Sequence, residues 1–217
     1  MDKRRSMSIV SVSIAILAIL VAGCGQERIS GLAKSGGSKA VYSQMPDLNV
    51  NPNKSYVAYV STTKGDFTIK LFAKEAPITV NNFIFLAQHH FYNGLKFHRI
   101  IDDFMIQTGD PKGDGTGGPG YTIPDEFDTE LKFKEGIVAM ANTGQPNSGG
   151  SQFFICTGSD ADNLNKEPKY SIFGTIESGM ETVKNIAGTP VEEGPGNTIK
   201  SKPTEEVLIN SIVIKSE

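Results

Sequence analysis

Several side chains in this 217-residue sequence could do chemistry or bind an ion, but each lacks the partners that its chemistry needs. His98 could act as a general base or a metal ligand, yet no Ser or Cys nucleophile stands in a recognisable elbow motif. Asp102, Asp103 and Asp110 match no known spacing of cation ligands. The glycine-rich segment 113–120 lacks the Gly-Lys-Ser/Thr ending of a phosphate-binding loop. We therefore predict no metal and no cofactor, and interpret the aspartates as turn residues and the glycines as a tight surface loop.

The elements that must position such residues are short and mostly β. Short apolar runs bounded by Gly, Asn, Asp or Pro predict strands, and alternation in 67–71 marks one buried face, whereas apolar residues at helical spacing after Pro77 predict a helix. The predicted strands cover 56–60, 67–71, 97–101, 105–108, 136–141, 151–156, 170–175 and 207–214, and the predicted helices cover 77–90 and 180–187. Many short strands with two helices favour a closed antiparallel barrel, because closure removes exposed strand edges.

Three segments carry a pattern of high specificity. Residues 91–101 read Phe-Tyr-Asn-Gly-Leu-Lys-Phe-His-Arg-Ile-Ile, residues 104–110 read Phe-Met-Ile-Gln-Thr-Gly-Asp, and the third segment runs from Met140-Ala141-Asn142 to Gln152-Phe153-Phe154-Ile155. Supporting matches are the glycines of 113–118, Asp125-Glu126-Phe127 and Ile172-Phe173-Gly174. In this order and spacing the segments resemble the signature segments of cyclophilins, over about residues 55–217.

The resemblance implies a mainly β fold, a closed eight-stranded antiparallel barrel capped by two α-helices, with a peptide groove on its outer face. It also implies a peptidyl-prolyl cis-trans isomerase in which Arg99 is the catalytic residue. By position, the walls of the proline pocket are Phe104, Met105, Phe154 and Leu164, and the residues that hold the peptide backbone are Gln107, Ala141, Asn142 and Gln152. Tyr170 stands where many cyclophilins have a pocket His, and Asn163 stands where many have a Trp.

Elementary chemistry explains why an arginine suits this reaction. Delocalisation of the nitrogen lone pair opposes rotation of a prolyl bond by ~18–20 kcal/mol. No bond is broken, so the enzyme must favour the twisted state, in which the nitrogen becomes pyramidal and can accept a hydrogen bond. Arg99 would supply a charged, rigid donor.

Other interpretations remain open at this point. Arg99 could be a surface salt-bridge partner, and Phe104, Met105 and Phe154 could belong to the core. A non-catalytic module that binds Pro-containing peptides is a second hypothesis, because Asn163 and Tyr170 alter the usual pocket pattern.

The amino-terminal residues have the pattern of an export signal. Lys3, Arg4 and Arg5 precede an apolar stretch, 9–21, which is shorter than the ~20 residues that span a bilayer. The sequence Leu-Val-Ala-Gly-Cys at 20–24 resembles the lipobox of bacterial lipoproteins, which implies acylation of Cys24 by chains such as palmitate. The alternatives are an ordinary signal peptide and a short membrane anchor with an incidental Cys.

These features define the expected organisation of the chain. Residues 1–23 form the lipoprotein signal peptide, 24–54 a lipid-anchored flexible linker, and 55–217 the isomerase domain. The sequence leaves open whether 45–53 packs against the domain. Cys156 lies in an apolar run and is interpreted as a small buried hydrophobe.

Composition and charge exclude some partners and suggest others. The chain is 38% hydrophobic and 21% charged, as in soluble globular folds. Its formal charge is −3, and removal of three basic residues and Asp2 with the signal would make it −5, which argues against nucleic acid. We expect a monomer on the extracytoplasmic face of the cell membrane, acting on Pro-containing peptides and on unfolded or exported proteins.

Overall fold

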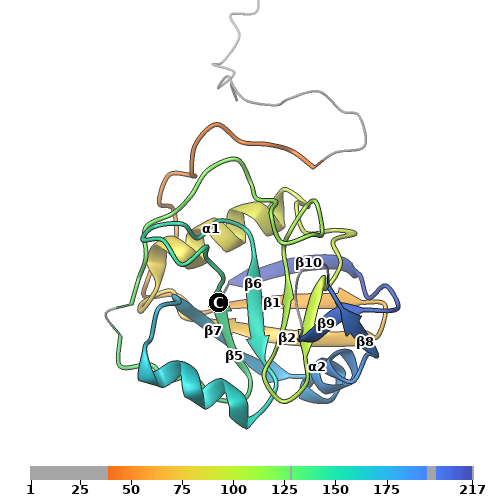
Figure 1. The fold of residues 1–217 in the computed structure, drawn as a ribbon. Coiled ribbons are helices and arrows are strands. Elements are labelled where there is room, and N and C mark those ends of the chain that lie inside the picture. Colours follow the sequence, from red (N-terminus) through yellow and green to blue (C-terminus); the bar gives the residue numbers. More distant parts are fainter. Residues whose placement is uncertain (1–38, 128, 195–198, 217) are drawn as a thin grey trace, which may run out of the picture. The chain divides into compact units, whose positions relative to one another are not determined.

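The structure is a computed structural model that describes residues 39–127, 129–194 and 199–216. The predicted signal peptide, the predicted lipidation site Cys24 and the first part of the predicted linker lie outside the described residues. Figure 1 shows the course of the chain through its strands and helices.

All eight predicted strands are present and form one sheet (Figure 1). Their order is β10-β1-β2-β7-β5-β6-β4-β3, and the pairings are antiparallel. The strands are β1 (Tyr56–Thr62), β2 (Gly65–Leu71), β3 (Arg99–Ile101), β4 (Met105–Thr108), β5 (Ile137–Met140), β6 (Phe153–Cys156), β7 (Ile172–Ser178) and β10 (Ile209–Ser216). In β2 every second side chain is buried, as the alternating sequence predicts.

The prediction of a closed barrel is wrong, because the sheet is an open half-barrel whose edge strands are β3 and β10. Among the described residues, the two edges meet through an isolated bridge between Lys96 and Leu208 and through a few backbone hydrogen bonds between residues 94–97 and 207–209. The contact lies upstream of both edge strands: the Phe97 N–H donates to the Val207 carbonyl at 2.9 Å. β3 has three residues, which is too short to carry a ladder that would close the sheet.

The edge at β3 is nevertheless covered. A small two-stranded sheet of β8 (Val191–Glu193) and β9 (Lys200–Pro203), which the sequence analysis missed, places β9 against β3. Covering an edge protects its unpaired backbone groups from pairing with another chain. Coverage by β9 therefore protects the edge strand β3, which closure of the barrel was expected to do.

Both predicted α-helices are present, as α1 (Pro77–Gln88) and α2 (Met180–Ala187), and a 3₁₀ helix, η1 (Ser159–Lys166), was not predicted. Pro77 occupies the first turn of α1. The backbone N–H groups of Ile78 and Thr79 donate to the carboxylate of Glu126, at 2.9 and 2.8 Å. A remote carboxylate thus satisfies the free donors at this helix end.

The main hydrophobic core lies on the side of the sheet that α1 covers. Phe83 of α1 meets Phe153 of β6 at 5.5 Å and Phe173 of β7 at 5.2 Å between ring centroids. All three side chains have no exposed surface. One face of strands β4, β5 and β6 therefore packs against the main core, and the opposite face can contribute side chains to a site.

Residues 45–53, whose packing the sequence left open, lie against the domain. The Asn49 N–H donates to the Asn81 side-chain oxygen at 2.9 Å, and the Asn81 amide donates to the Asp47 carbonyl at 3.0 Å. Val50 packs against the main core. The predicted boundary between linker and domain at 54/55 stays a prediction. Within the described part of the chain, no helix is long and apolar enough to cross a membrane.

Candidate functional site

A cavity of about 210 Å³ opens on the side of β4, β5 and β6 that faces away from the main core. Its lining consists of nine residues from five separate parts of the sequence, namely Arg99, Phe104, Met105, Gln107, Ala141, Asn142, Phe154, Leu164 and Tyr170. Each of the nine was predicted from the sequence to serve catalysis or peptide binding. The structure therefore brings together all the predicted site residues except Gln152, whose place is described below.

Arg99 is the first residue of β3 and lies half-buried at the side of this cavity. Its Nη1 atom lies 3.9 Å from the sulfur of Met105, which is a weak acceptor. Among the described residues no carboxylate forms an ion pair with Arg99. The interpretation of Arg99 as a surface salt-bridge residue is therefore not supported. Burial lowers the pKa of the guanidinium and nearby Tyr170 acts in the opposite direction, but an arginine stays charged at neutral pH.

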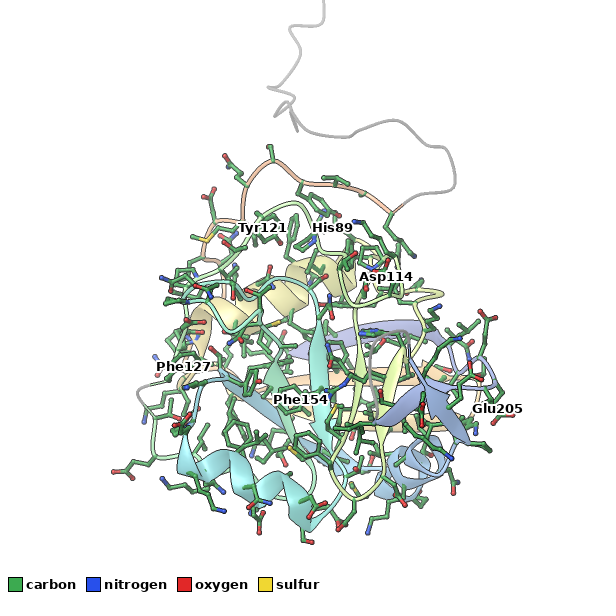
Figure 2. All side chains as sticks on the ribbon, in the orientation of Figure 1. His89, Asp114, Tyr121, Phe127, Phe154 and Glu205 are labelled. Carbon is green, nitrogen blue, oxygen red and sulfur yellow. The ribbon has the colours of Figure 1, made fainter. Side chains whose placement is uncertain are left out.

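The floor of the cavity is apolar and rests on a second hydrophobic cluster. Met105 and Phe154 are 1% and 5% exposed, and both belong to this cluster, which is separate from the main core. The ring of Tyr170 meets the ring of Phe154 edge-on at 5.2 Å. Figure 2 marks the position of Phe154, a residue of β6. Phe104, Met105 and Phe154 are therefore both packed side chains and walls of an open slot.

Gln152 lies beside this cavity, where it joins a strand to the glycine-rich loop. Its side-chain oxygen accepts from the Gln107 amide at 2.9 Å. Its own amide donates to the carbonyls of Gly115 and Gly117, at 3.0 and 2.9 Å. Both ends of this carboxamide are engaged within the protein, so Gln152 fixes the shape of the groove.

The main chain of Asn142 is available at the rim. Its side chain is held from both ends, because the amide donates to the Lys169 carbonyl at 2.7 Å and the oxygen accepts from the Gly144 N–H at 3.0 Å. In the part of the chain that the structure covers, no backbone group bonds to the Asn142 N–H or carbonyl. A peptide laid along this edge could use both groups.

Two larger cavities adjoin the small one. The first, of about 570 Å³, shares Gln107, Ala141 and Asn142 with it and continues along the glycine-rich loop to Tyr121. The second, of about 610 Å³, shares Arg99 and Gln107 and extends between the loop and residues 201–206. The sequence predicted that the glycine-rich loop lies beside the groove, but no pattern in it indicated that Tyr121 or residues 201–206 form parts of the walls.

The other polar residues singled out in the sequence have structural roles. Asp103 lies in the turn between β3 and β4, and its carboxylate accepts from the Ser159 N–H and hydroxyl, at 3.2 and 3.1 Å. The buried carboxylate of Asp110 accepts from the N–H groups of Lys112 and Gly115, at 2.7 and 2.5 Å, and so folds the glycine-rich loop. Both were interpreted as turn residues, and the structure agrees.

His98 and Cys156 are poor candidates for acid-base or nucleophilic chemistry. Burial lowers the pKa of His98, and both ring nitrogens are buried without a partner among the described residues. Burial, with Asp162 nearby, raises the pKa of the Cys156 thiol to about 12. The prediction that Cys156 is a small buried hydrophobe is confirmed, since its side chain is fully buried.

Comparison with known proteins gives one consistent family. The sequence model described as cyclophilin type peptidyl-prolyl cis-trans isomerase/CLD matches residues 57–214. Peptidyl-prolyl cis-trans isomerase B of Streptomyces anulatus is 40% identical over 177 residues, which cover 73% of this chain and 96% of that protein. Peptidyl-prolyl cis-trans isomerase A of Mycobacterium tuberculosis is 41% identical over 182 residues, with 76% and 94% covered.

A solved structure agrees with these relatives. A cyclophilin-type isomerase of Cryptosporidium parvum, crystallised in the presence of the dipeptide Ala-Pro, superposes with a TM-score of 0.65 and 37% identity. The match covers 74% of this chain and 99% of that one. The similarity therefore spans nearly the whole of each relative and about three quarters of this chain.

Proposed function

The chain belongs to the cyclophilin-type family and is a peptidyl-prolyl cis-trans isomerase, and from this premise we propose that Arg99 is its catalytic residue and the 210 Å³ cavity its proline site. The observation that carries the proposal is the position of one charged donor, without a carboxylate partner in the described chain, beside an apolar slot. The Ala-Pro dipeptide present with the Cryptosporidium parvum protein supports a proline-containing ligand at the same fold.

The chemistry follows from this arrangement. Phe104, Met105 and Phe154 hold the pyrrolidine ring while the carbonyl on the other side of the prolyl bond rotates. In the twisted state the imide nitrogen is pyramidal and its lone pair accepts a hydrogen bond from the guanidinium of Arg99. This bond exists only in the transition state, so it lowers the barrier without tightening the ground state. Each ~1.4 kcal/mol of such stabilisation raises the rate about tenfold.

The peptide backbone is held beside the slot. The free main-chain groups of Asn142 would pair with the peptide, and Gln107 would contact it from β4. No covalent intermediate or proton transfer is needed, which agrees with a buried His98 and a buried Cys156. The enzyme is proposed to act as a monomer.

An exchange assay on an Xaa-Pro peptide tests the role of Arg99. We expect Arg99→Ala to lower kcat/KM about 30- to 150-fold. This corresponds to a loss of about 2–3 kcal/mol in transition-state stabilisation, which is the value of a charge-assisted hydrogen bond. Lys70→Ala is the control, because Lys70 is an exposed cation on β2 away from the cavity. Saturable binding with no enhanced exchange by the wild type would instead favour the non-catalytic binding module.

We propose further that the chain is a lipoprotein on the extracytoplasmic face of the cell membrane and assists the folding of exported proteins. The support is the amino-terminal sequence, in which Lys3, Arg4 and Arg5, the apolar stretch 9–21 and the small residues before Cys24 occur together. Thioether and amide-linked acyl chains on residue 24 would give stable anchoring.

Labelling of cells with radioactive palmitate tests the anchor. The wild-type chain should carry label and sediment with membranes, and Cys24→Ser should lose both. An unlabelled wild-type chain released into the medium would indicate an ordinary signal peptide. An unlabelled chain that stays with the membrane in both forms would indicate a short membrane anchor.

A further inference from the structure

We propose that residues 39–50, here named the strap, position one wall of the substrate groove, and that Tyr42 is a positioning residue that sets the preference for residues flanking proline. The inference rests on the proposed use of the groove for peptides. The strap precedes residue 57, where the match to the family begins. It therefore lies outside the segment that the family model describes.

Tyr42 is the point where the strap meets the loop. Its N–H donates to the Pro119 carbonyl at 2.8 Å. Its ring lies edge-on to Phe85 of α1 at 5.1 Å and to Tyr121 of the loop at 6.4 Å. One side chain thus connects the helix α1 to the loop, whose residue Tyr121 also packs against the main core.

The loop closes tightly under the strap at Gly120. This residue has φ of +102°, a conformation that L side chains rarely adopt. A Cβ atom there would lie 2.6 Å from Cγ1 of Val41 and would also collide with the carbonyl oxygen of Tyr42. The strap can reach its position only because residue 120 has no side chain.

The same loop residues form the wall of the 570 Å³ cavity. Pro119, Gly120 and Tyr121 line it, together with Gly150 on the other side. The Tyr121 hydroxyl donates to the Asn82 side-chain oxygen at 2.6 Å, and the Asn82 amide donates to the Gly150 carbonyl at 2.7 Å. The rings of Tyr121 and His89, both labelled in Figure 2, each lie edge-on to Tyr42, at 6.4 and 6.2 Å between ring centroids. A shift of the strap would therefore move a wall that is continuous with the proline site.

The strap is held at both ends as well as at its centre. The ammonium group of Lys39 donates a hydrogen bond to the Asn93 carbonyl. The N–H groups of Asn49 and Val50 donate hydrogen bonds to the side-chain oxygen of Asn81, which is buried. With Tyr42 these contacts lay the strap across α1. Its position is thus fixed independently of the loop that it supports.

The test compares kcat/KM for three peptides on the full chain in detergent. One peptide contains Ala-Pro alone, and the others add three residues before or after it. For Tyr42→Ala we expect kcat/KM to fall about fivefold on at least one extended peptide, the value of a lost aromatic contact, and to stay within about twofold on the short one. Tyr42→Phe keeps the ring contacts and should behave as the wild type.

Gly120→Ala attacks the same contact from the loop side and should reproduce the selective loss on the same extended peptide. Tyr59→Ala is a matched control, since Tyr59 is an exposed tyrosine on β1 outside the groove cavities. Equal losses on all three peptides, or no loss with either variant, would overturn the positioning role. A wild-type chain inactive on every peptide would instead contradict the proposed catalytic site.

Discussion

The two faces of strands β4, β5 and β6 differ in what they enclose, although their side chains come from alternate positions of the same short segments. Facing the main core are Ile106, Val138, Met140, Phe153 and Ile155. Facing the groove cluster are Met105, Ile137, Ala139, Phe154 and Cys156. This alternation is the period of two that a β-strand imposes on its side chains.

The difference between the faces separates stability from function. The inner face is sealed by α1, and aromatic rings contact Phe153 there from three directions. On the outer face, the Phe154 ring stacks against Phe133 on one side. On its other side it lines the 210 Å³ cavity, where a ligand can reach it. Adjacent phenylalanines should therefore respond differently to the same substitution.

The largest effect on stability is expected for Phe153→Ala. Removal of a fully buried ring that contacts Phe83, Tyr92 and Phe173 should lower the free energy of unfolding by about 4 kcal/mol. Urea unfolding followed by circular dichroism measures it. The folded fraction should keep its catalytic rate, and a loss of rate larger than the loss of folded protein would break the comparison.

Phe154→Ala should show the reverse balance. The space left by the ring opens to solvent, so the loss of stability should be smaller, about 2 kcal/mol. The proline site loses its floor, and kcat/KM should fall about 30-fold because a ring contact worth about 2 kcal/mol is gone. Parallel unfolding and exchange measurements decide the point. Equal ratios of the two effects in both phenylalanine variants would show that the faces do not differ.

Gln152→Glu sharpens the comparison at the rim of the outer face. The substitution replaces an amide that donates to Gly115 and Gly117 with a carboxylate oxygen that repels both carbonyls. We expect a loss of about 1–2 kcal/mol in unfolding free energy and weaker binding of extended peptides. Gln145→Glu, on an exposed loop, is the control. Unchanged binding by the Gln152 variant would remove this residue from the groove.

The sequence predicted the parts of this arrangement that depend on local patterns. Short apolar runs bounded by turn residues located the eight strands, and the contiguous segments around Arg99 and Phe154 located the cavity walls. The 3₁₀ helix Ser159–Lys166 was missed because it is almost entirely polar and buries only Ala161. The helix is held instead by Phe133, which is remote in sequence. The Asn165 side-chain amide donates to the Phe133 carbonyl, and the Phe133 N–H donates to the Asn165 side-chain oxygen, both at 2.8 Å.

Features that depend on long-range geometry could not be predicted. Closure of the sheet was expected from the strand count, but it depends on how residues 94–97 and 207–209 meet. The position of the strap depends on contacts of Tyr42 and of the side-chain oxygen of Asn81. No hydrophobic periodicity in the sequence indicates these contacts. The composition of 24–54, rich in Gly, Ser and Asn, describes a linker equally well whether or not it docks.

The smallest expected effect is a pH dependence from His98, which precedes β3. Burial lowers its pKa in the folded chain; Asp110 and Asp114 act against this change, and Lys96 and Arg99 add to it. As pH falls below about 6.5, the unfolded chain takes up the proton first, so the free energy of unfolding should decrease. His98→Asn should show a flatter profile in urea titrations between pH 5 and 8. Identical slopes would contradict this account.

The most direct test of the central claim is exchange NMR on an Xaa-Pro peptide at matched occupancy of wild-type, Arg99→Lys and Arg99→Ala chains. Chemical-shift titration sets the occupancy, so that binding and turnover are measured separately. The account predicts similar affinities, a wild-type exchange rate far above the uncatalysed one, and a fall of about 30-fold or more in both variants. Wild-type exchange rates in Arg99→Ala at full occupancy would contradict it.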